Sequence, residues 1–261
     1  MTTAAHALFI ADAHLRGTAE AAEQEKVRRL HRFLTQAAPS VALLCICGDL
    51  FDFWFEYRHA VVNRYFRTLR LLADLVDNGT EVHYVAGNHD FWMRDFLAQE
   101  VGLVVHRHTF QGHVAGQRVF VRHGDGIDVG DRGYRLLKRV LQHPVGVAMY
   151  RLVHPDLGVP VAEFFSTLSR NHGAQREFRG RQHYRAYAEH TIARGQDVVV
   201  LAHTHEPTCE PIANGVYLNP GDWITHFTFG LVDQNGVWLK EWMGDQGARE
   251  IAHLPLPSTQ R

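Results

Sequence analysis

Apolar and polar residues alternate along the chain in blocks that predict strands and helices in turn. Apolar runs that each end in polar residues predict five buried strands, at 7–12, 41–47, 81–87, 118–124 and 197–203. Between them, apolar residues at helical spacing predict helices over 20–37 and 60–77. Shorter apolar runs separated by turn residues predict a meander of strands around Val216–Leu218, Phe227–Val232 and Val237–Trp242. Strands that alternate with helices and then form a meander indicate an α/β protein with more than one sheet.

The length and composition are those of one globular domain. The chain has 261 residues, of which 46% are hydrophobic and 21% charged. Its N-terminal stretch "MTTAAHALFIADAHL" lacks the basic and long apolar regions of a signal peptide, and no uncharged run is long enough to span a membrane. The odd number of cysteines, with Cys45 and Cys47 on one face of a predicted strand, indicates buried reduced thiols. We therefore expect a single cytoplasmic domain over 1–261.

Charge is divided unevenly along the chain. The formal net charge is −1, but residues 132–194 contain 11 Lys and Arg against 4 Asp and Glu. The same segment contains apolar stretches, including Phe164 and Phe165, that charged residues and prolines interrupt. We expect a helical lid, inserted at about 131–194, with an apolar interior and a cationic mouth. The alternative is that these apolar residues only pack the inserted helices.

Such a lid favours a substrate that carries both phosphates and acyl chains. Nucleic acid is a poorer fit, because the chain is nearly neutral overall and a phosphate backbone does not select apolar helices.

Polar residues with metal-binding potential follow the last apolar residue of every predicted buried strand. They are Asp12 and His14, Asp49 and Asp52, Asn88, His89 and Asp90, His123 and Asp125, and His203 and His205. Taken singly, "DAH" is explained by a helix cap and "GNHD" by a turn. The carboxyl ends of adjacent strands in an α/β sheet, however, meet at the edge where ligands bind. The sequence therefore predicts that these side chains share one crevice.

The donor types in this set suit a pair of transition-metal ions. Asp, Asn and His favour Mn²⁺, Fe²⁺, Zn²⁺ or Co²⁺ over Ca²⁺, and the absence of cysteine from the set argues against a structural zinc site. The chain contains 19 histidines in all. Two ions about 3.5–4 Å apart need a bridging ligand, which a carboxylate provides. Asp49 is the natural candidate, because Gly48 allows the backbone to come close.

Five motifs in order resemble the signature of the calcineurin-like metallophosphoesterases. They are "DAH" at 12–14, "GDLFD" at 48–52, "GNHD" at 87–90, "HGD" at 123–125 and "AHTH" at 202–205, where Ala202 replaces the usual Gly. The resemblance implies an αββα sandwich of two sheets and a two-metal phosphoesterase site. By this resemblance one ion is held by Asp12, His14, Asp49 and His205. The second ion is held by Asp49, Asn88, His123 and His203.

The charges at such a site predict the chemistry. A water between two dications loses its proton near neutral pH, and the hydroxide attacks phosphorus in line with the leaving group. His89 would stabilise the phosphoryl charge or protonate the departing oxygen, and Asn88 and Asp90 are the other catalytic candidates, with Asp90 expected to hold His89. Asp52 and Asp125 are expected to orient neighbouring groups. For Asp52, a helix cap or loop stabiliser is the alternative.

A closer resemblance covers nearly the whole chain. The stretches "FIADAHL", "GDLFDFWFEY", "GNHDFW", "HGDGIDVGDRGY" and "LNPGDW" together resemble the UDP-2,3-diacylglucosamine pyrophosphatases of lipid A biosynthesis. The resemblance implies Mn²⁺-dependent hydrolysis of UDP-2,3-diacylglucosamine to UMP and 2,3-diacylglucosamine 1-phosphate, at the cytoplasmic face of the inner membrane. His89 stands where the better-known branch has Arg, so the chain is similar to the "GNHD" branch.

The resemblance also implies substrate contacts. Asp131, Asn88 and His203 match substrate-contacting positions, and His89 joins them as the candidate proton donor. Four lid arginines are hypotheses for pyrophosphate or sugar contacts, with a solvated surface as the alternative: Arg170, Arg176, Arg179 and Arg185.

Two other functions remain open. One is a phosphodiesterase or nucleotidase that acts on another nucleotide or on a phospholipid-like substrate. The other is a non-catalytic scaffold of the same fold, which the complete ligand set disfavours.

Overall fold

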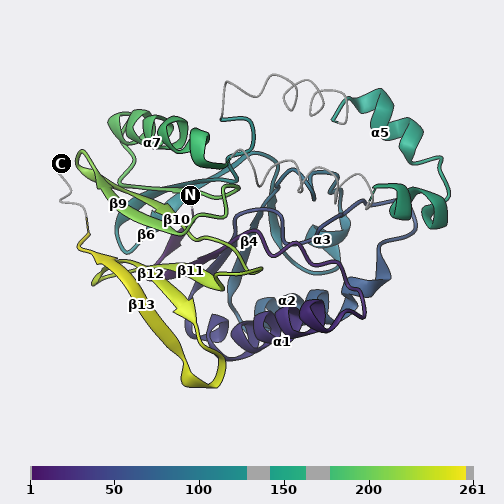
Figure 1. The fold of residues 1–261 in the computed structure, drawn as a ribbon, viewed down its shortest axis with the longest axis horizontal. Helices are drawn as coiled ribbons and strands as arrows, with labels where there is room; N and C mark the ends of the chain where they lie inside the picture. Colours follow the sequence, from purple (N-terminus) through teal and green to yellow (C-terminus); the bar gives the residue numbers. More distant parts are fainter. Residues whose placement is uncertain (1, 128–141, 163–176, 257–261) are drawn as a thin grey trace.

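A computed structural model describes residues 2–127, 142–162 and 177–256, whose strands form two sheets (Figure 1). The larger sheet has seven strands in the order β13-β12-β11-β2-β3-β4-β5. Its parallel half consists of β2 (Ala7–Ile10), β3 (Leu43–Ile46), β4 (Glu81–Val85) and β5 (Val104–His106). Its antiparallel half consists of β11 (Thr228–Asp233), β12 (Gly236–Trp242) and β13 (Ala248–Leu254).

The smaller sheet has six strands in the order β1-β6-β7-β8-β10-β9. These are β1 (Thr3–Ala4), β6 (Thr109–Val114), β7 (Gln117–Arg122), β8 (Val198–Leu201), β10 (Gly215–Asn219) and β9 (Thr208–Ile212). The central strands β7, β8 and β10 run parallel, while β6 and β9 pair antiparallel at either side of them.

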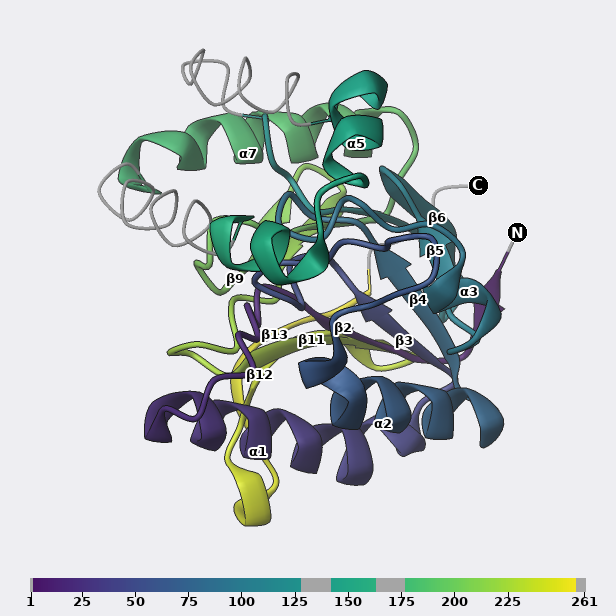
Figure 2. The ribbon, with the colours of Figure 1, turned by 90° about the vertical axis from the view of Figure 1, so that its right-hand side faces the viewer.

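Helices cover the outer faces of the two stacked sheets (Figure 2). The larger sheet is covered by α1 (Ala21–Gln36) and α2 (Phe66–Asp77), and the smaller sheet by α7 (Glu177–Ala193). A buried apolar cluster that includes Phe9, Cys45, Val121, Val200 and Leu218 fills the space between the sheets. The layers therefore follow the order helix, sheet, sheet, helix, which confirms the αββα sandwich.

The described chain also contains shorter elements. They are α3 (Phe96–Gln99), α5 (Pro144–Tyr150) and the 3₁₀ turns Ala38–Ser40, Asn63–Tyr65 and Gly244–Gln246, and residues 155–162 are helical as well. Within the described part of the chain, no helix is both long and apolar enough to cross a membrane.

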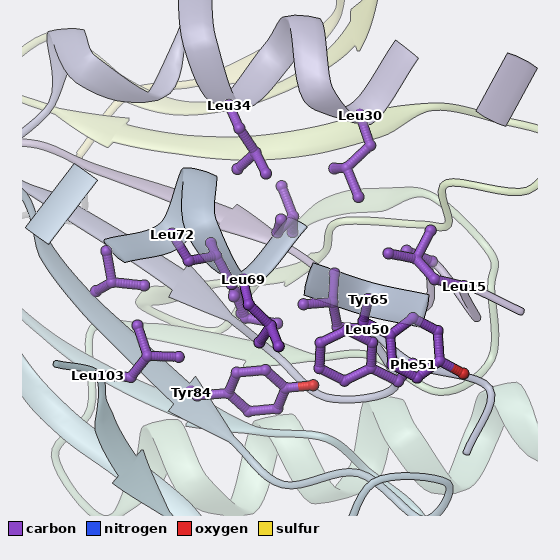
Figure 3. Close-up of a cluster of buried hydrophobic side chains, with 14 of the residues drawn as sticks. Leu15, Leu30, Leu34, Leu50, Phe51, Tyr65, Leu69, Leu72, Tyr84 and Leu103 are labelled. Atoms are coloured by element: carbon purple, nitrogen blue, oxygen red, sulfur yellow. The ribbon is translucent and has the colours of Figure 1, made fainter. Parts of the chain in front are cut away.

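The core between the larger sheet and helices α1 and α2 anchors the loops that leave the strands of this sheet (Figure 3). Leu30 and Leu34 lie one turn apart on α1 and point to the sheet, as their helical spacing predicts. Leu15 and Leu50, just beyond β2 and β3, are buried in the same cluster, and the Leu15 N–H donates to the Leu50 carbonyl at 2.9 Å. These anchors fix the loops that carry Asp12, His14 and Asp49.

The predicted strands and helices are present, but their ends differ. The five predicted buried strands stop one or two residues early, at Ile10, Ile46, Val85, Arg122 and Leu201, because the polar residues that follow belong to loops. The helix predicted from residue 60 begins at Phe66, after a 3₁₀ turn. The sequence pattern missed β1, β5, β6, β9, β13 and α3, which are short or lie toward the sheet edges.

The described part of the segment expected to form an insertion contacts the sandwich through α7, α5 and Val159, which is buried in the core cluster of the larger sheet. Tyr184, Ala188 and Ile192 of α7 are buried against the smaller sheet. On α5, the Tyr150 ring lies 4.6 Å from the Phe55 ring, centroid to centroid, while the helix itself has no fully buried side chain.

Candidate metal centre

The candidate ligands lie on loops that leave the carboxyl ends of strands in both sheets. Asp12 and His14 follow β2, Asp49 follows β3 and Asn88 follows β4 in the larger sheet. From the smaller sheet, the loop after β7 carries His123, and the loop after β8 carries His203 and His205. The two sheets therefore meet at the crevice that the sequence predicted.

One group of donor atoms is formed by Asp12, His14 and His205. Oδ1 of Asp12 lies 3.5 Å from Nε2 of His205 and 3.8 Å from Nε2 of His14. The two Nε2 atoms are 3.3 Å apart. A carboxylate oxygen and two imidazole nitrogens at these mutual distances can bind one cation.

A second group is centred on His123. Its Nε2 lies 3.3 Å from Oδ2 of Asp49, 3.1 Å from Oδ1 of Asn88 and 3.2 Å from Nδ1 of His203. Oδ2 of Asp49 also lies 3.7 Å from Nε2 of His14, in the first group. The same oxygen therefore faces both groups, which is the position that a bridging ligand requires.

Backbone groups hold the ligands in these orientations. Oδ2 of Asp12 accepts a hydrogen bond from the His203 N–H, and Oδ1 of Asp49 accepts one from the His89 N–H, both at 2.9 Å. Nδ1 of His123 donates to the Cys47 carbonyl at 2.9 Å, which directs its Nε2 toward the group. Oδ1 of Asp12 is buried and accepts no hydrogen bond from the described residues, so a cation would satisfy it.

The loops adopt backbone conformations that non-glycine residues avoid. Asp12, His14, Asp49, His203 and His205 have φ values of 51°, 42°, 53°, 72° and 58°, in the left-handed region. Such strain gathers at functional sites, where surrounding contacts hold it.

Two glycines allow the loops to approach each other closely. A Cβ at Gly87 would lie 2.1 Å from Oδ1 of Asp49, and a Cβ at Gly48 would lie 2.5 Å from Nδ1 of His123. Only glycine fits at both positions, which explains the Gly residues that precede Asp49 and Asn88.

Burial and charge shift the pKa values of the ligands in opposite directions. Burial alone would raise the pKa of Asp49, but the His123 and His89 charges bring it well below its ordinary value. Burial raises the pKa of Asp12 well above its ordinary value. Burial also lowers the pKa of His14 to about 4 and that of His203 to about 3. Those two imidazoles are therefore neutral, as metal ligands must be.

The His123 and Asp49 side chains form a coupled pair. Burial lowers the pKa of His123, but the Asp49 charge outweighs it and raises the pKa to about 10. The site is thus a buried set of carboxylates and imidazoles whose charges a divalent cation would balance.

His89 occupies a distinct position beside the metal ligands. Its Nδ1 donates to the Asp52 carbonyl at 3.0 Å, and its Nε2 lies 4.0 Å from Oδ2 of Asp49. The fixed Nδ1 directs Nε2 toward the crevice. His14, Asp49 and His89 also form a third group of donor atoms within 4.8 Å of one another, so the geometry allows His89 to be a ligand as well as a proton donor.

The three acids expected to support the ligands differ in their contacts. Oδ1 of Asp52 lies 3.6 Å from Nδ1 of His14 and 3.9 Å from Nδ1 of His89, behind both rings. Asp125 is buried, and its charge raises the pKa of His203 against the larger effect of burial. These positions suit the expected orienting role.

Asp90 does not hold the His89 ring as expected. Its Oδ1 accepts from the Gly87 N–H at 2.7 Å, and its Oδ2 accepts from the Leu50 N–H at 3.0 Å and from the Tyr84 hydroxyl at 2.5 Å. The carboxylate therefore ties the loop after β3 to the loop after β4. Burial raises its pKa to about 6.

Sequence reasoning missed Asp222 at this site. Its buried Oδ2 lies 3.9 Å from Nδ1 of His205 and 2.7 Å from Nδ1 of His226, and its Oδ1 accepts from the backbone N–H groups of Ile224 and Thr225. The available signal was its place in "LNPGDW", another acid just after an apolar strand.

The lid candidates give less information. Asp131, Arg170 and Arg176 lie outside the described residues, and the Arg179 side chain is not among those described. Arg185 places Nη1 2.9 Å from Oε2 of Glu210 at the surface, which fits the solvated-surface alternative.

Comparisons with known proteins agree with this geometry. Residues 5–207 match the model of the calcineurin-like phosphoesterase family. A protein of Porphyromonas gingivalis named UDP-2,3-diacylglucosamine hydrolase is 35% identical over 173 residues, which are 66% of this chain and 66% of that protein. Proteins of the same name align more fully. In Edwardsiella ictaluri the identity is 26% over 96% of this chain and 97% of that protein, and in Stenotrophomonas maltophilia it is 28% over 93% and 99%.

Among solved structures, Yfce, a phosphoesterase from E. coli, aligns with 96% of this chain and 99% of its own, with a TM-score of 0.49 and 16% identity. The family match includes every strand-end loop of the crevice, from Asp12 to His205. The chain is a phosphoesterase and belongs to the calcineurin-like family.

Proposed function

We propose that the chain hydrolyses the pyrophosphate bond of UDP-2,3-diacylglucosamine, releasing UMP and 2,3-diacylglucosamine 1-phosphate. The names of the relatives in three bacterial genera support this substrate. The structural observation that carries the proposal is an exposed apolar surface joined to the loop of the candidate metal centre.

This apolar surface lies on α5 and the chain that follows it. Large side chains are exposed there, with Met149 at 66% and Leu152 at 87% of their areas, together with Val145, Leu157 and Val161. Exposed apolar patches of this kind mark binding sites. A substrate with two acyl chains would cover such a surface, whereas a small nucleotide would leave it in water.

The surface is connected to the candidate metal centre through aromatic contacts. Tyr150 packs on Phe53 and Phe55, with ring centroids 6.3 Å and 4.6 Å away. These phenylalanines follow Asp52 directly, on the loop whose carbonyl fixes His89. Acyl chains bound at α5 would therefore lie beside the loop that orients the reacting groups.

The chain's own residues have distinct roles in the proposed reaction. Asp12, His14, Asp49 and His205 would hold one ion, and Asp49, Asn88, His123 and His203 would hold the other. Two such ions, which we propose to be Mn²⁺, would supply positive charge for the phosphoryl oxygens and lower the pKa of water. Asn88 and His203 also contact the pyrophosphate. His89, oriented by the Asp52 carbonyl, donates a proton from Nε2 to the departing oxygen.

We place the enzyme at the cytoplasmic face of the inner membrane, as a peripheral protein. The exposed apolar side chains of α5 support this placement, since its substrate carries acyl chains. The second candidate is a phosphodiesterase or nucleotidase for another nucleotide or phospholipid-like substrate, which the match to the broad phosphoesterase family supports.

Substrate preference tests the proposal. With Mn²⁺ present, kcat/KM for UDP-2,3-diacylglucosamine should exceed that for UDP-glucose or a dinucleoside polyphosphate by at least about 100-fold, because only the first covers the apolar surface. Leu152→Gln should raise KM for the lipid substrate and leave KM for the other two compounds unchanged. Ile251→Gln, at an exposed apolar position on β13, should leave KM unchanged for all three compounds. Equal turnover of all three compounds would refute the assignment.

A further inference from the structure

A buried ion pair lies behind the loop that carries His14. Glu23 and Lys26, in the first turns of α1, are 2% and 7% exposed. Nζ of Lys26 lies 2.9 Å from Oε2 of Glu23. Buried charges of this kind are uncommon on a helix, because both groups lose their hydration.

Among the described residues, the other hydrogen bonds of this pair go to the backbone of the loop, and Oε2 of Glu23 also lies 3.5 Å from Nε of Arg16 on the same loop. Nζ of Lys26 donates to the carbonyl of His14 at 2.7 Å. Oε1 of Glu23 accepts from the N–H groups of Arg16 and Gly17, at 2.7 Å and 3.3 Å. The pair therefore binds three backbone groups of the segment 14–17: the carbonyl of His14 and the N–H groups of Arg16 and Gly17. His14 and Gly17, at its ends, have positive φ values of 42° and 65°.

Stability alone does not explain this arrangement. Apolar residues of similar volume in place of a buried ion pair are often neutral or stabilising. The same helix carries a second pair at the same spacing, Glu25 and Arg28, with Nη2 2.7 Å from Oε2. Both of those side chains are exposed, and within the described residues their side-chain hydrogen bonds join them to each other. The buried pair differs in that it holds the backbone of a metal-ligand loop.

We propose that Lys26 and Glu23 are positioning residues that fix His14 for the cation site formed by Asp12, His14 and His205. The Lys26 ammonium holds the His14 carbonyl, and Glu23 holds the N–H groups of Arg16 and Gly17, so the loop keeps its strained conformation. The imidazole of His14 then stays with Nε2 toward the ligand group and Nδ1 toward Asp52. This inference rests on the proposed metal centre but not on the identity of the substrate.

Metal titration without substrate tests the inference. Wild type and Lys26→Met, both stripped by a chelator, are titrated with Mn²⁺ in a calorimeter. In the variant, one of the two ions should bind about 10–100-fold more weakly, as is typical when a residue behind a ligand is lost. The ion held by Asn88, His123 and His203 should keep its affinity. The Mn²⁺ concentration for half-maximal hydrolysis of a chromogenic phosphodiester should rise by the same factor as the dissociation constant of the weaker ion. Saturating Mn²⁺ should restore turnover.

The matched control is Arg28→Met, which removes a cation from the exposed pair of the same helix and should leave both affinities unchanged. Glu23→Gln combined with Lys26→Met removes both buried charges and should fold if the single variant does not. The glutamine keeps a side-chain oxygen that can accept from the N–H groups of Arg16 and Gly17. This double variant should show the same loss of affinity for one of the two Mn²⁺ ions. If Lys26→Met or the double variant folds and binds two ions with wild-type affinity, and only its melting temperature is lower, the proposal is overturned. If the wild-type protein binds two ions but does not hydrolyse the lipid substrate, the proposed function is refuted and the positioning role of Lys26 and Glu23 is not.

Discussion

At the scale of single residues, the two oxygens of Asp49 have separate roles. Oδ1 accepts the His89 N–H and so fixes the carboxylate, while Oδ2 faces His14, His123 and His89 at 3.7, 3.3 and 4.0 Å. An amide can replace the first role but not the charge of the second. The negative charge on one oxygen is therefore the feature on which the pair of cation sites depends.

Asp49→Asn should remove this charge while the loop keeps its shape. We expect Mn²⁺ content to fall from two ions toward none, and phosphodiester hydrolysis to fall by about 100-fold or more, since the bridging ligand serves both ions. Metal analysis by mass spectrometry and a hydrolysis assay measure the two effects. Asp77→Asn, at an exposed position in α2, should change neither. Two retained ions in Asp49→Asn would show that another group bridges them.

His89→Ala separates the two roles that its geometry allows. If His89 is the proton donor, the variant keeps both ions and turnover falls by about 10²–10⁴-fold. We expect this result, because the Asp52 carbonyl fixes Nδ1 and directs Nε2 to the crevice. A variant that loses an ion would instead identify His89 as a ligand alongside His14 and Asp49.

At the scale of elements, α7 joins the middle segment of the chain to the smaller sheet. Ile192 is buried among Val199, Leu201 and Tyr217. A Cβ on Gly215 would lie 2.9 Å from the Ile192 side chain, so the helix and β10 are in close contact. The position of α7 therefore depends on the size of a few apolar side chains.

Ile192→Ala should lower the free energy of unfolding by about 2–4 kcal/mol, because it leaves a cavity under α7. Urea denaturation followed by circular dichroism measures this change. The control is Ile251→Ala on β13, where the side chain is 48% exposed and the loss should stay below about 1 kcal/mol. Equal losses in the two variants would mean that α7 is not packed as described.

The sequence was informative wherever an apolar run changed abruptly to polar residues. Asp12, Asp49 and His203 were predictable, because they follow within two or three residues of strands buried on both faces. The partners of Asp90 were not, since Leu50, Tyr84 and Gly87 come from different loops and strands that only the folded chain brings together. The edge strand β13 also escaped prediction, because most of its side chains are exposed and show no alternation of apolar and polar residues.

At the scale of the whole molecule, the candidate metal centre lies where the two sheets meet. The ligands after β2, β3 and β4 come from the larger sheet, and those after β7 and β8 come from the smaller. Each cation site takes donors from both sheets: Asp12 with His205, and Asp49 with His123. Bound ions would therefore link the two halves of the sandwich.

Removal of metal should destabilise the entire fold. An ion present at 100 times its Kd contributes about 2.7 kcal/mol, which corresponds to a fall in Tm of about 5–10 °C when it is chelated. Differential scanning calorimetry with and without EDTA measures the shift, and excess Mn²⁺ should reverse it. Asp49→Asn should melt at the same temperature in both buffers. If the wild-type Tm is the same with and without EDTA, bound ions do not link the two sheets.

The distribution of ligands along the chain also sets an order for biosynthesis. The β8 strand and the two histidines after it leave the ribosome long after Asp12 and Asp49, yet they supply donors to both groups. A nascent chain that stops before β8 would contain Asp12, His14, Asp49, Asn88 and His123 without His203 and His205. Each proposed cation site would then lack one donor, so we expect such a chain to gain less stabilisation from bound metal than a chain that includes β8.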